Sequence, residues 1–509
     1  MRGAPFCKVD FAMTGGYGYM DPVFYPQLFL YIPALMVVFG ASVSCAYRMF
    51  MVIINIATVL ISYYCFGKIS KNKIAALFCT AIYTLNHYRL RDCIMRGALG
   101  EVLFICFIPV VIYSIYCIFN SETDKWPLLM IGATCIFQSH IIGALLTAVG
   151  GAVFIAVYFI KTVVSGRKLK EPVIALIKAG TGTVFLNIWY LVPMLYYYVQ
   201  DFEMFSGDSF YKYIYYSNTL KGILLDYTFD YESRYWLYSR TGLLFAVIFV
   251  VLLSLIVYNS IREKRIRDET LIIFLSIIFL ITASSYLPWE KIAQIGIIEK
   301  FMSTVQFAFR MITLFIIFVI VALAMFLKNK VNKRSRLIIG VLSILTVISG
   351  ACYYIVENQT FNGYDGEFWF STVPPEYFMT ETKHGEVTRR EKYRTYTDDV
   401  VVLKDDNIAA GKKVIVENKS ATDNWIEIPL YYYDGYCAYS EKEQMYLPVQ
   451  FGENGVIRII IPPQVTGTIN IQYNSKGIFH IAELVSTITA IFMIVYFTKI
   501  KSKRRAGTV

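Results

Sequence analysis

Long apolar stretches alternate with short polar ones over most of the chain. About 20 apolar residues suffice to cross the hydrocarbon core of a bilayer, and by this measure the pattern predicts eleven membrane-spanning segments. They lie at 48–66, 74–86, 98–119, 126–140, 142–161, 173–198, 241–260, 270–287, 304–327, 336–356 and 478–499. Because 74–86 and 126–140 are short, we expect neighbouring residues to extend them or the bundle to pair them. The predicted fold class is a mainly α-helical, polytopic membrane protein.

Residues 357–477 follow a different pattern. Short runs such as "DDVVVLKDD", "KKVIVENK", "GVIRIIIP" and "GTINIQYNS" alternate apolar and polar positions and are separated by Gly, Asn and Pro. A period of two residues with such punctuation predicts an antiparallel β-sandwich-like domain. The domain is either a structural cap or a carbohydrate-contacting module that uses Trp369, Trp425 and the run "YYYDGYCAY" at 431–439.

Composition agrees with a chain whose main solvent is lipid. Of its 509 residues, 56% are hydrophobic and 17% charged, and the mean hydropathy is +0.51. The net charge of +11 could suggest a nucleic-acid partner, but Lys and Arg gather at the ends of apolar segments, where orientation signals are expected. We therefore expect no nucleic-acid binding. The ten cysteines form no CxxC pair, so neither a zinc site nor a disulfide framework is predicted.

The distribution of Lys and Arg predicts the orientation of the spans, because cytoplasmic loops carry the excess of positive charge. With alternate crossings, one side receives all the strongly basic segments. These are Lys68, Lys71 and Lys73, then Arg167, Lys168 and Lys170, then "REKRIR" at 262–267, "KNKVNKRSR" at 328–336 and the tail "KIKSKRR" at 499–505. We expect this side to be cytoplasmic. The opposite, outer side then receives 86–97, 199–240, 288–303 and the β-rich region 357–477.

Residues 27–44, "QLFLYIPALMVVFGASVS", are apolar enough to cross, but Pro33 and the aromatic residues also suit a helix at the outer interface. Before them, no apolar segment resembles a signal peptide. The predicted domains are an outer loop and interfacial helix at 1–47, a transmembrane bundle at 48–356, the extracytoplasmic β-rich domain at 357–477, and a transmembrane anchor with a basic cytoplasmic tail at 478–509.

The segment "NHYRLRDCIMRGALGE" at 86–101 carries unusual charge for its place between two apolar segments. It contains Arg89, Arg91, Asp92, Arg96 and Glu101, and burying such groups costs several kcal/mol unless they are paired or face water. Two explanations remain open. Asp92 or Glu101 pairs with Arg96, or the guanidinium groups bind an anionic head group, whose phosphate oxygens match the planar fork of Arg.

Two further segments place polar groups near the same side. "FMSTVQFAFRM" puts Gln306 and Arg310 four residues apart, which predicts one face of a helix just below the outer surface. An arginine at that depth suggests a functional site, although pairing inside the bundle is common. "FQSHIIGALL" puts His140 at the outer end of a short span. His140 is either structural or part of an outward-facing cavity with Arg310 and the 86–101 group.

The outer loop 199–240 carries Asp201, Glu203, Asp208, Asp226, Asp230 and Glu232 among many tyrosines. It is a solvated acidic loop, or a surface for sugar or a divalent cation. Nothing in the sequence matches the Walker A, HExxH, GxSxG or Rossmann patterns. No catalytic residue and no metal ligand is therefore assigned, and the cofactor is unknown, with a divalent cation as one option.

Five segments together resemble a known family. "GGYGYMDPVFYPQLFLYIPALM", "NHYRLRDCIMRGALGEVL", "QSHIIGALL", "VQFAFRM" and "IPLYYYDGYCAY" occur in the order typical of the bacterial 6-pyruvoyl-tetrahydropterin-synthase-related membrane domain family. These polytopic proteins resemble YfhO-like proteins and GT-C glycosyltransferases. The resemblance covers nearly the whole chain, and it implies a GT-C-like bundle in the bacterial plasma membrane.

The resemblance implies transfer of a sugar from a polyprenyl-phosphate carrier to a cell-envelope acceptor on the outer face. It also implies an interfacial helix after the first outer loop, which 27–44 matches, and an acidic residue in that loop as base or metal ligand. The chain departs from the pattern because a first span and its acidic motif are missing. A misplaced start, a truncated gene or a degenerate copy would explain this. Asp10 and Asp21 lie in the loop but do not match the expected position.

On this reading Arg89, Arg91 and Arg96 hold the phosphate of the lipid-linked sugar. Asp92 and Glu101 orient these arginines, while Gln306, Arg310 and His140 contribute from neighbouring helices. The alternative is a non-catalytic protein that binds or moves lipid-linked glycans, or assists envelope assembly, with the same residues. Ion-coupled transport would predict inverted repeats, and the sequence shows none.

Overall fold

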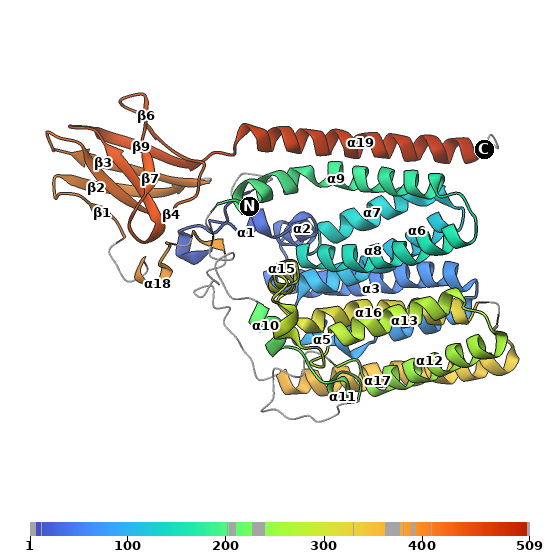
Figure 1. The fold of residues 1–509 in the computed structure, drawn as a ribbon. Helices are drawn as coiled ribbons and strands as arrows, with labels where there is room; N and C mark the ends of the chain where they lie inside the picture. Colours follow the sequence, from blue (N-terminus) through green and yellow to red (C-terminus); the bar gives the residue numbers. More distant parts are fainter. Residues whose placement is uncertain are drawn as a thin grey trace. The chain divides into compact units, whose positions relative to one another are not determined.

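The computed structural model of the chain is mostly helical, with antiparallel β-sheets near the C-terminus (Figure 1). It describes residues 7–11, 13–200, 202, 210–225, 240–328, 330–361, 377–379, 381–387, 392–408 and 410–505. Tertiary contacts divide the chain into two compact units. The bundle unit comprises Gln27–Val184 and Asp208–Asp365, and the sandwich unit comprises Met1–Pro26, Phe185–Gly207 and Gly366–Val509.

Helices occupy all eleven apolar segments that the sequence predicts. They are α3 (Val43–Ser70), α4 (Lys73–Thr84), α6 (Leu99–Phe119), α7 (Trp126–Phe137), α8 (Ile141–Val164), α9 (Lys170–Tyr198), α12 (Leu243–Glu263), α13 (Asp268–Thr282), α16 (Met311–Phe326), α17 (Lys333–Phe361) and α19 (Gly477–Arg505). Eight helices of the described residues are long and apolar enough to cross a membrane. The helices α4, α7 and α13 are shorter, so the count of eleven spans stays a prediction.

Shorter elements connect the long helices of the bundle unit. They are η2 (Leu28–Leu30), α2 (Tyr31–Val38), α5 (His87–Ile94), η3 (Thr123–Lys125), α10 (Phe210–Tyr215), α11 (Leu220–Leu224), α14 (Trp289–Ile292), α15 (Gly296–Val305) and η6 (Ala308–Arg310). At 1.5 Å per residue, the eleven residues of η2 and α2 would extend roughly 17 Å, well short of the roughly 30 Å of a hydrocarbon core. Residues 27–44 therefore do not form a spanning helix, and their interfacial position stays a prediction.

The helices α6 and α16 form the centre of the bundle unit. Nearly every side chain of both helices is buried, as expected for helices that are apolar on all sides. The outer helices α3, α12 and α17 instead expose many large apolar side chains. Such faces are the ones that a bilayer would cover. The central pair matters for function because Glu101 lies in the first turn of α6 and Arg310 directly precedes α16.

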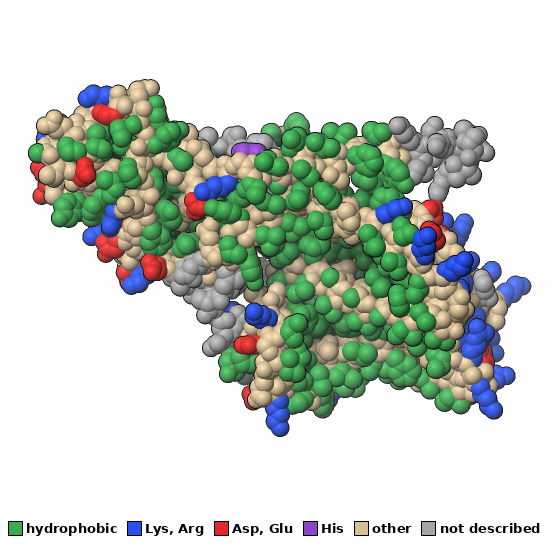
Figure 2. All heavy atoms as spheres, turned by 45° about the horizontal axis from the view of Figure 1, so that its top comes forward, with side chains coloured by type: hydrophobic (Ala, Val, Ile, Leu, Met, Phe, Trp, Pro, Cys, Tyr) green, Lys and Arg blue, Asp and Glu red, His purple; other side chains and the backbone are tan. Residues whose placement is uncertain are grey.

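The basic loops of the bundle unit gather at one end of its helices. Lys161 near the end of α8 pairs with Asp268 at the start of α13, while Arg167 and Lys328 bond to residues in the last turn of α6. Figure 2 shows Lys and Arg side chains concentrated at one end of the apolar bundle surface. This grouping agrees with the predicted alternation of spans. Which end is cytoplasmic stays a prediction.

The sandwich unit contains two antiparallel sheets. Strands β1 (Arg394–Thr395), β4 (Asn424–Tyr431), β8 (Val456–Ile461) and β7 (Val449–Phe451) form one sheet in the order β1-β4-β8-β7. The other sheet has the order β2-β3-β9-β5-β6 and contains β2 (Val400–Ile408), β3 (Gly411–Asn418), β9 (Thr466–Tyr473), β5 (Tyr436–Ser440) and β6 (Met445–Leu447). The prediction of an antiparallel β-domain is confirmed, and all four quoted alternating runs lie on strands.

Both sheets bury their apolar positions in one core, as the alternation predicts. Val414 of β3 lies opposite Ile469 of β9, and Ile426 of β4 lies opposite Ile459 of β8; all four are buried in one cluster. Short elements complete the unit: η1 (Thr14–Gly16), α1 (Asp21–Phe24), α18 (His384–Val387) and η8 (Glu453–Gly455). Tyr431 N at the end of β4 donates a hydrogen bond to Tyr17 O at 2.8 Å, which connects the N-terminal segment to the sheet.

Candidate functional site

The charged segment of the bundle unit folds as the short helix α5. Asn86 caps it, because its Oδ1 accepts a hydrogen bond from Tyr88 N at 3.0 Å, and Asn is a favoured capping residue. Arg89, Arg91 and Asp92 of this helix are all buried, with at most 3% of their surface exposed. The segment 86–101 is thus no exposed loop. Its charges are packed into an apolar bundle, where they need partners.

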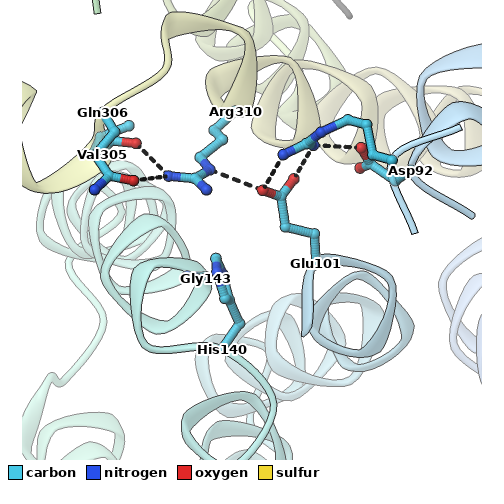
Figure 3. A network of polar contacts seen from close by, with 8 residues as sticks. Asp92, Glu101, His140, Gly143, Val305, Gln306 and Arg310 are labelled. Carbon is cyan, nitrogen blue, oxygen red and sulfur yellow. Dashed lines mark hydrogen bonds and ion pairs between the residues drawn. The ribbon is translucent and has the colours of Figure 1, made fainter. Parts of the chain in front are cut away.

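A network of ion pairs joins α5, α6 and the start of α16 (Figure 3). Arg96 Nη1 donates to Asp92 Oδ1 at 2.6 Å. Arg96 also donates two parallel hydrogen bonds to Glu101, 2.8 and 2.9 Å long, which is the strong bidentate geometry of Arg with a carboxylate. Arg310 Nε then donates to Glu101 Oε1 at 2.9 Å. Of the two explanations for this segment, internal pairing of Arg96 is therefore present, and with both carboxylates at once.

Arg310 reaches the network from a break in the chain and not from a continuous helix. The helix α15 ends at Val305, and Gln306 has φ +64°, outside helical geometry. The prediction that Gln306 and Arg310 share one helix face is therefore wrong. They still meet, since Arg310 Nη1 donates to Gln306 Oε1 at 3.3 Å and to the carbonyl of Val305 at 2.7 Å. The guanidinium satisfies a carbonyl that the break leaves without its helical donor.

His140 caps α8 beside the network. Its Nδ1 accepts a hydrogen bond from Gly143 N at 3.0 Å, and its ring stacks on Phe104 at 5.9 Å between centroids. A neutral ring that accepts at Nδ1 carries its proton on Nε2. Figure 3 shows this ring pointing toward the region of Arg310 and Glu101.

Gly143 permits this arrangement. A Cβ atom at this position would lie 2.5 Å from the ring of Phe104, a separation that real Cβ atoms do not tolerate. The close approach of α8 to α6 therefore depends on glycine, and with it the place of the His140 ring.

Arg89 points away from the network. Its Nη1 donates to Thr84 O and its Nη2 to Thr58 Oγ1, both at 3.0 Å, so it faces α3. Nε of Arg89 has no acceptor among the described residues. Arg91 is also buried, with 2% exposed. The expected group of three arginines around one ligand is therefore not formed, because Arg96 joins Arg310 while Arg89 turns to the opposite side of α5.

The ion-pair network is balanced in formal charge. Arg96 and Arg310 face Asp92 and Glu101, whereas Arg89 donates to groups of α4 and α3. Burial, followed by the neighbouring Glu101, raises the pKa of Asp92, which lowers the negative charge of the network. Burial would lower the pKa of Arg96, but Asp92 and Glu101 outweigh it and raise that pKa.

Helix ends add a positive field to the network. The helices α6, α8 and α16 have 21, 24 and 16 residues, and their N-termini meet here, since Glu101, His140 and Arg310 mark the first residues of each. The N-terminus of a helix carries roughly half a positive charge and exposes N–H donors. Three such ends beside Arg96 and Arg310 make this part of the bundle suited to an anion.

Two aromatic rings that sequence reasoning did not assign cover the guanidinium groups. Arg96 lies over Phe309, 4.8 Å from its centroid, and Arg310 lies over Phe307 at 4.7 Å. The two rings stack on each other at 5.1 Å. Cations are attracted to aromatic faces, and the signal for this was present in the sequence as the alternation Phe-Ala-Phe-Arg at 307–310.

Other residues considered from the sequence lie elsewhere or outside the described residues. Asp10 and Asp21 belong to the sandwich unit, where burial, followed by the charge of Asp10, raises the pKa of Asp21 to about 7. The described residues contain no group of three His, Cys, Asp or Glu that could hold a metal ion. Outside the described residues lie Trp369 and the carboxylates Asp201, Glu203, Asp208, Asp226, Asp230 and Glu232.

The run at 431–439 mixes buried and half-buried positions. Tyr431, Tyr433 and Tyr436 are buried in the sandwich, and the ring of Trp425 lies under the guanidinium of Arg458 at 4.3 Å. Of the two readings of this domain, these contacts favour a structural one for the tyrosines, because buried rings offer no surface to a carbohydrate.

Long apolar helices around a buried network of charges define a multi-pass membrane protein with a polar site at one end of its central helices. The chain belongs to a family of unknown function, DUF6541, whose model matches residues 7–296. No curated protein and no solved structure matches the chain. The matched residues include the whole segment 86–101 and His140, while Gln306 and Arg310 lie beyond them.

Proposed function

We propose that the protein binds the phosphate of a polyprenyl-phosphate-linked sugar at the network of Arg96, Glu101 and Arg310, and transfers the sugar to a cell-envelope acceptor. The observation that carries this proposal is the meeting of two guanidinium groups, Arg96 and Arg310, with the N-termini of α6, α8 and α16 inside an apolar bundle. Arginine side chains and helix N-termini both favour an anion, and a phosphate offers oxygens to both. The resemblance to GT-C glycosyltransferases supplies the sugar carrier and the acceptor, and with them the bacterial plasma membrane as the site of action.

Arg310 offers a specific contact for the phosphate. Its Nε and Nη1 are used by Glu101, Val305 and Gln306, and Nη2 donates no hydrogen bond to any described residue. A phosphate oxygen at Nη2 would also lie in the field of the α8 and α16 N-termini and near the Nε2 proton of His140. Glu101 would hold Arg96 and Arg310 in place so that their charges need little rearrangement as the phosphate leaves.

Transfer also needs a base for the acceptor hydroxyl. That oxygen would attack the anomeric carbon, the bond from this carbon to the phosphate oxygen would break, and the lipid phosphate would leave with the electron pair. Glu101 accepts three hydrogen bonds from Arg96 and Arg310. Asp92 keeps Oδ2 without a partner among the described residues, and its pKa is raised, so Asp92 is the stronger candidate to take the proton.

A second function is binding of the lipid-linked sugar without transfer. The pairing of Asp92 with Arg96 favours it, because a carboxylate held by a guanidinium is a weaker base. Asp92→Asn separates the two functions, since it removes the base and keeps the shape of the side chain. Loss of transfer with retained binding supports the enzyme, whereas an active Asp92→Asn variant excludes Asp92 as the base.

The first test of the proposal is Arg310→Gln in proteoliposomes that contain radiolabelled polyprenyl-phosphate sugars and envelope acceptors. We expect retention of labelled lipid and transfer of label to fall at least 100-fold, because the phosphate loses its charge partner. Arg336→Gln, the same change at an exposed arginine, is the matched control and should behave as the unaltered protein. Arg310→Lys, which keeps the charge but not the fork, should fall between the two.

Folding must be checked in parallel, since Arg310→Gln also takes a partner from Glu101. A monodisperse protein with an unfolding midpoint within a few degrees of the unaltered one validates the comparison. Equal lipid retention and transfer in a folded Arg310→Gln variant would refute the proposed site.

A further inference from the structure

A second polar site lies apart from the network, where α4 ends and α12 begins. A pocket there is lined by Leu85, Asn86, His87, Phe245, Ile248 and Ser349, among others. The cavity measures about 20 Å³. Since roughly 10–15 Å³ holds one water, the interior admits one small polar group and excludes a sugar ring or an acyl chain.

The polar end of the pocket contains an amide donor without an acceptor. Asn86 has 3% of its surface exposed, and its Oδ1 is held by the cap of α5, where it accepts from Tyr88 N. The cap fixes the amide orientation, so Nδ2 must point the other way, and it bonds to no described residue. A buried N–H donor left without a partner costs about 1–3 kcal/mol, which an occupant with an acceptor oxygen would recover.

The groups beside Asn86 are neutral. His87 Nε2 and Ser349 Oγ are 3.1 Å apart, and the His87 ring stacks on Tyr353 at 4.3 Å. Burial lowers the pKa of His87 to about 4, and none of the described residues that line the pocket is charged. The occupant is thus held at this point by a neutral oxygen and not by a phosphate.

The walls and surroundings of the pocket match lipid. The apolar side of the pocket is formed by Leu85 at the end of α4 and by Phe245 and Ile248 in the first two turns of α12. Next to it, Val247 and Val251 of α12 and Ile348 of α17 are exposed by 48%, 51% and 51%. Exposed apolar faces of this kind on two long apolar helices would face the bilayer. The Asn86 amide therefore lies near the end of a span, the depth at which a glycerophospholipid carries its ester carbonyls.

We propose that this pocket binds the ester carbonyl of one glycerophospholipid, which accepts a hydrogen bond from Asn86 Nδ2, while the acyl chains lie outside the pocket along the exposed apolar faces of α12 and α17. The proposal is independent of the sugar-phosphate function. It explains why an amide donor is buried among apolar residues. It also assigns Asn86 two roles, since one end of its amide caps α5 and the other holds the lipid.

The test measures phospholipid retained by the full chain after detergent purification, by native mass spectrometry. Ile248→Phe fills the pocket, and we expect it to lower occupancy at least tenfold. Val247→Phe makes a similar change one residue away on the exposed face and should retain lipid as the unaltered protein does. Asn86→Ser keeps a capping oxygen but removes the amide donor, so occupancy should fall three- to tenfold.

Two results would overturn the proposal. One is equal occupancy in Ile248→Phe and Val247→Phe. The other is an unaltered protein that carries no phospholipid after reconstitution into phosphatidylethanolamine and phosphatidylglycerol nanodiscs, which would mean that the pocket holds only water. If Ile248→Phe does not fold, Asn86→Ser decides, because its cap is preserved and only the lipid contact is lost.

Discussion

Two buried glutamates, one in each unit, use the same chemistry for different ends. Glu427 in the sandwich is fully buried, accepts hydrogen bonds from Arg458 at 2.8 and 3.2 Å, and has Trp425 under that guanidinium. Glu101 in the bundle is likewise buried, is bound by arginines, and lies beside aromatic rings. A buried Glu with Arg and an aromatic ring is therefore not by itself a sign of function.

The difference lies in exposure and in the sharing of the carboxylate. Arg458 is 28% exposed and matches Glu427 one to one, and the backbone N–H of Glu453 donates a further hydrogen bond to Glu427 at 2.7 Å. Glu101 is instead shared by Arg96 and Arg310, whose side chains are 15% and 8% exposed, and the N-termini of α6, α8 and α16 lie beside it. The pair in the sandwich is complete by itself, whereas the bundle network lies in a field that favours an anion.

Glu101→Gln should separate the two regions most strongly. It leaves Arg96 and Arg310 without their shared carboxylate, and breaking a buried ion pair costs about 3–5 kcal/mol. Glu427→Gln should cost about 1–3 kcal/mol, because Arg458 can turn toward water. Thermal unfolding in detergent measures both. A thiol-reactive dye follows the bundle through the buried thiols of Cys65, Cys79 and Cys106, and limited proteolysis of the β-strand region follows the sandwich.

The comparison between the units fails if the two glutamine variants lose equal stability. The comparison is sharpened if a polyprenyl phosphate raises the unfolding midpoint of the unaltered bundle but not that of the sandwich. An anion that binds only the folded bundle would stabilise that unit alone.

Asp21 provides a third case, a buried carboxyl with no Arg or Lys partner among the described residues. Its folded pKa of about 7 lies above the ordinary value near 3.9, so ionisation opposes folding. The penalty is absent below about pH 4, grows as the pH rises toward 7, and is complete above that. Asp21→Asn should therefore stabilise the protein on the order of 2–4 kcal/mol at pH 8.

The same substitution should have little effect at pH 4, where the folded carboxyl is protonated and the unfolded one is about half protonated. Unfolding midpoints of both proteins between pH 4 and 8 test this. A gain that does not vary with pH would mean that the Asp21 pKa is ordinary, and it would remove the contrast with the paired glutamates.

The sequence predicted the helices and the β-domain better than it predicted the site. Apolar runs and period-two alternation act over neighbouring residues, so α6 (predicted 98–119, found Leu99–Phe119) and β8 (Val456–Ile461) follow directly from local pattern. The break at Gln306 does not. The run 304–327 is apolar apart from Gln306, Arg310 and two threonines, and no local pattern marks the point where Phe307 N and Arg310 Nη1 both bond to the Val305 carbonyl.

The site shows the same limit. Pairing of Arg96 with Asp92 could be predicted because the two are four residues apart. The bond of Arg310 to Glu101 spans 209 positions, and no local pattern encodes it. Arg89 was grouped with Arg96 by proximity in sequence, but the two lie on different sides of α5, where the partners on α3 and α6 decide the direction of each side chain.

The smallest expected effect concerns the rings that cover the arginines. Phe309→Leu removes the aromatic face 4.8 Å from Arg96, and the loss of a partly desolvated cation–π contact with some packing should cost about 1–2 kcal/mol. Phe315→Leu is the matched control, because Phe315 is buried on α16 against Phe245 and Phe249 with no cation over its ring. A double-mutant cycle with Arg96→Met isolates the contact. The cost of Phe309→Leu should shrink in the Arg96→Met background, and that of Phe315→Leu should stay the same. If both costs are unchanged, the Phe309 ring contributes packing alone. The positive charge of Arg96 then has one stabilising partner fewer than the geometry indicates, so Arg96 depends more on an anionic ligand.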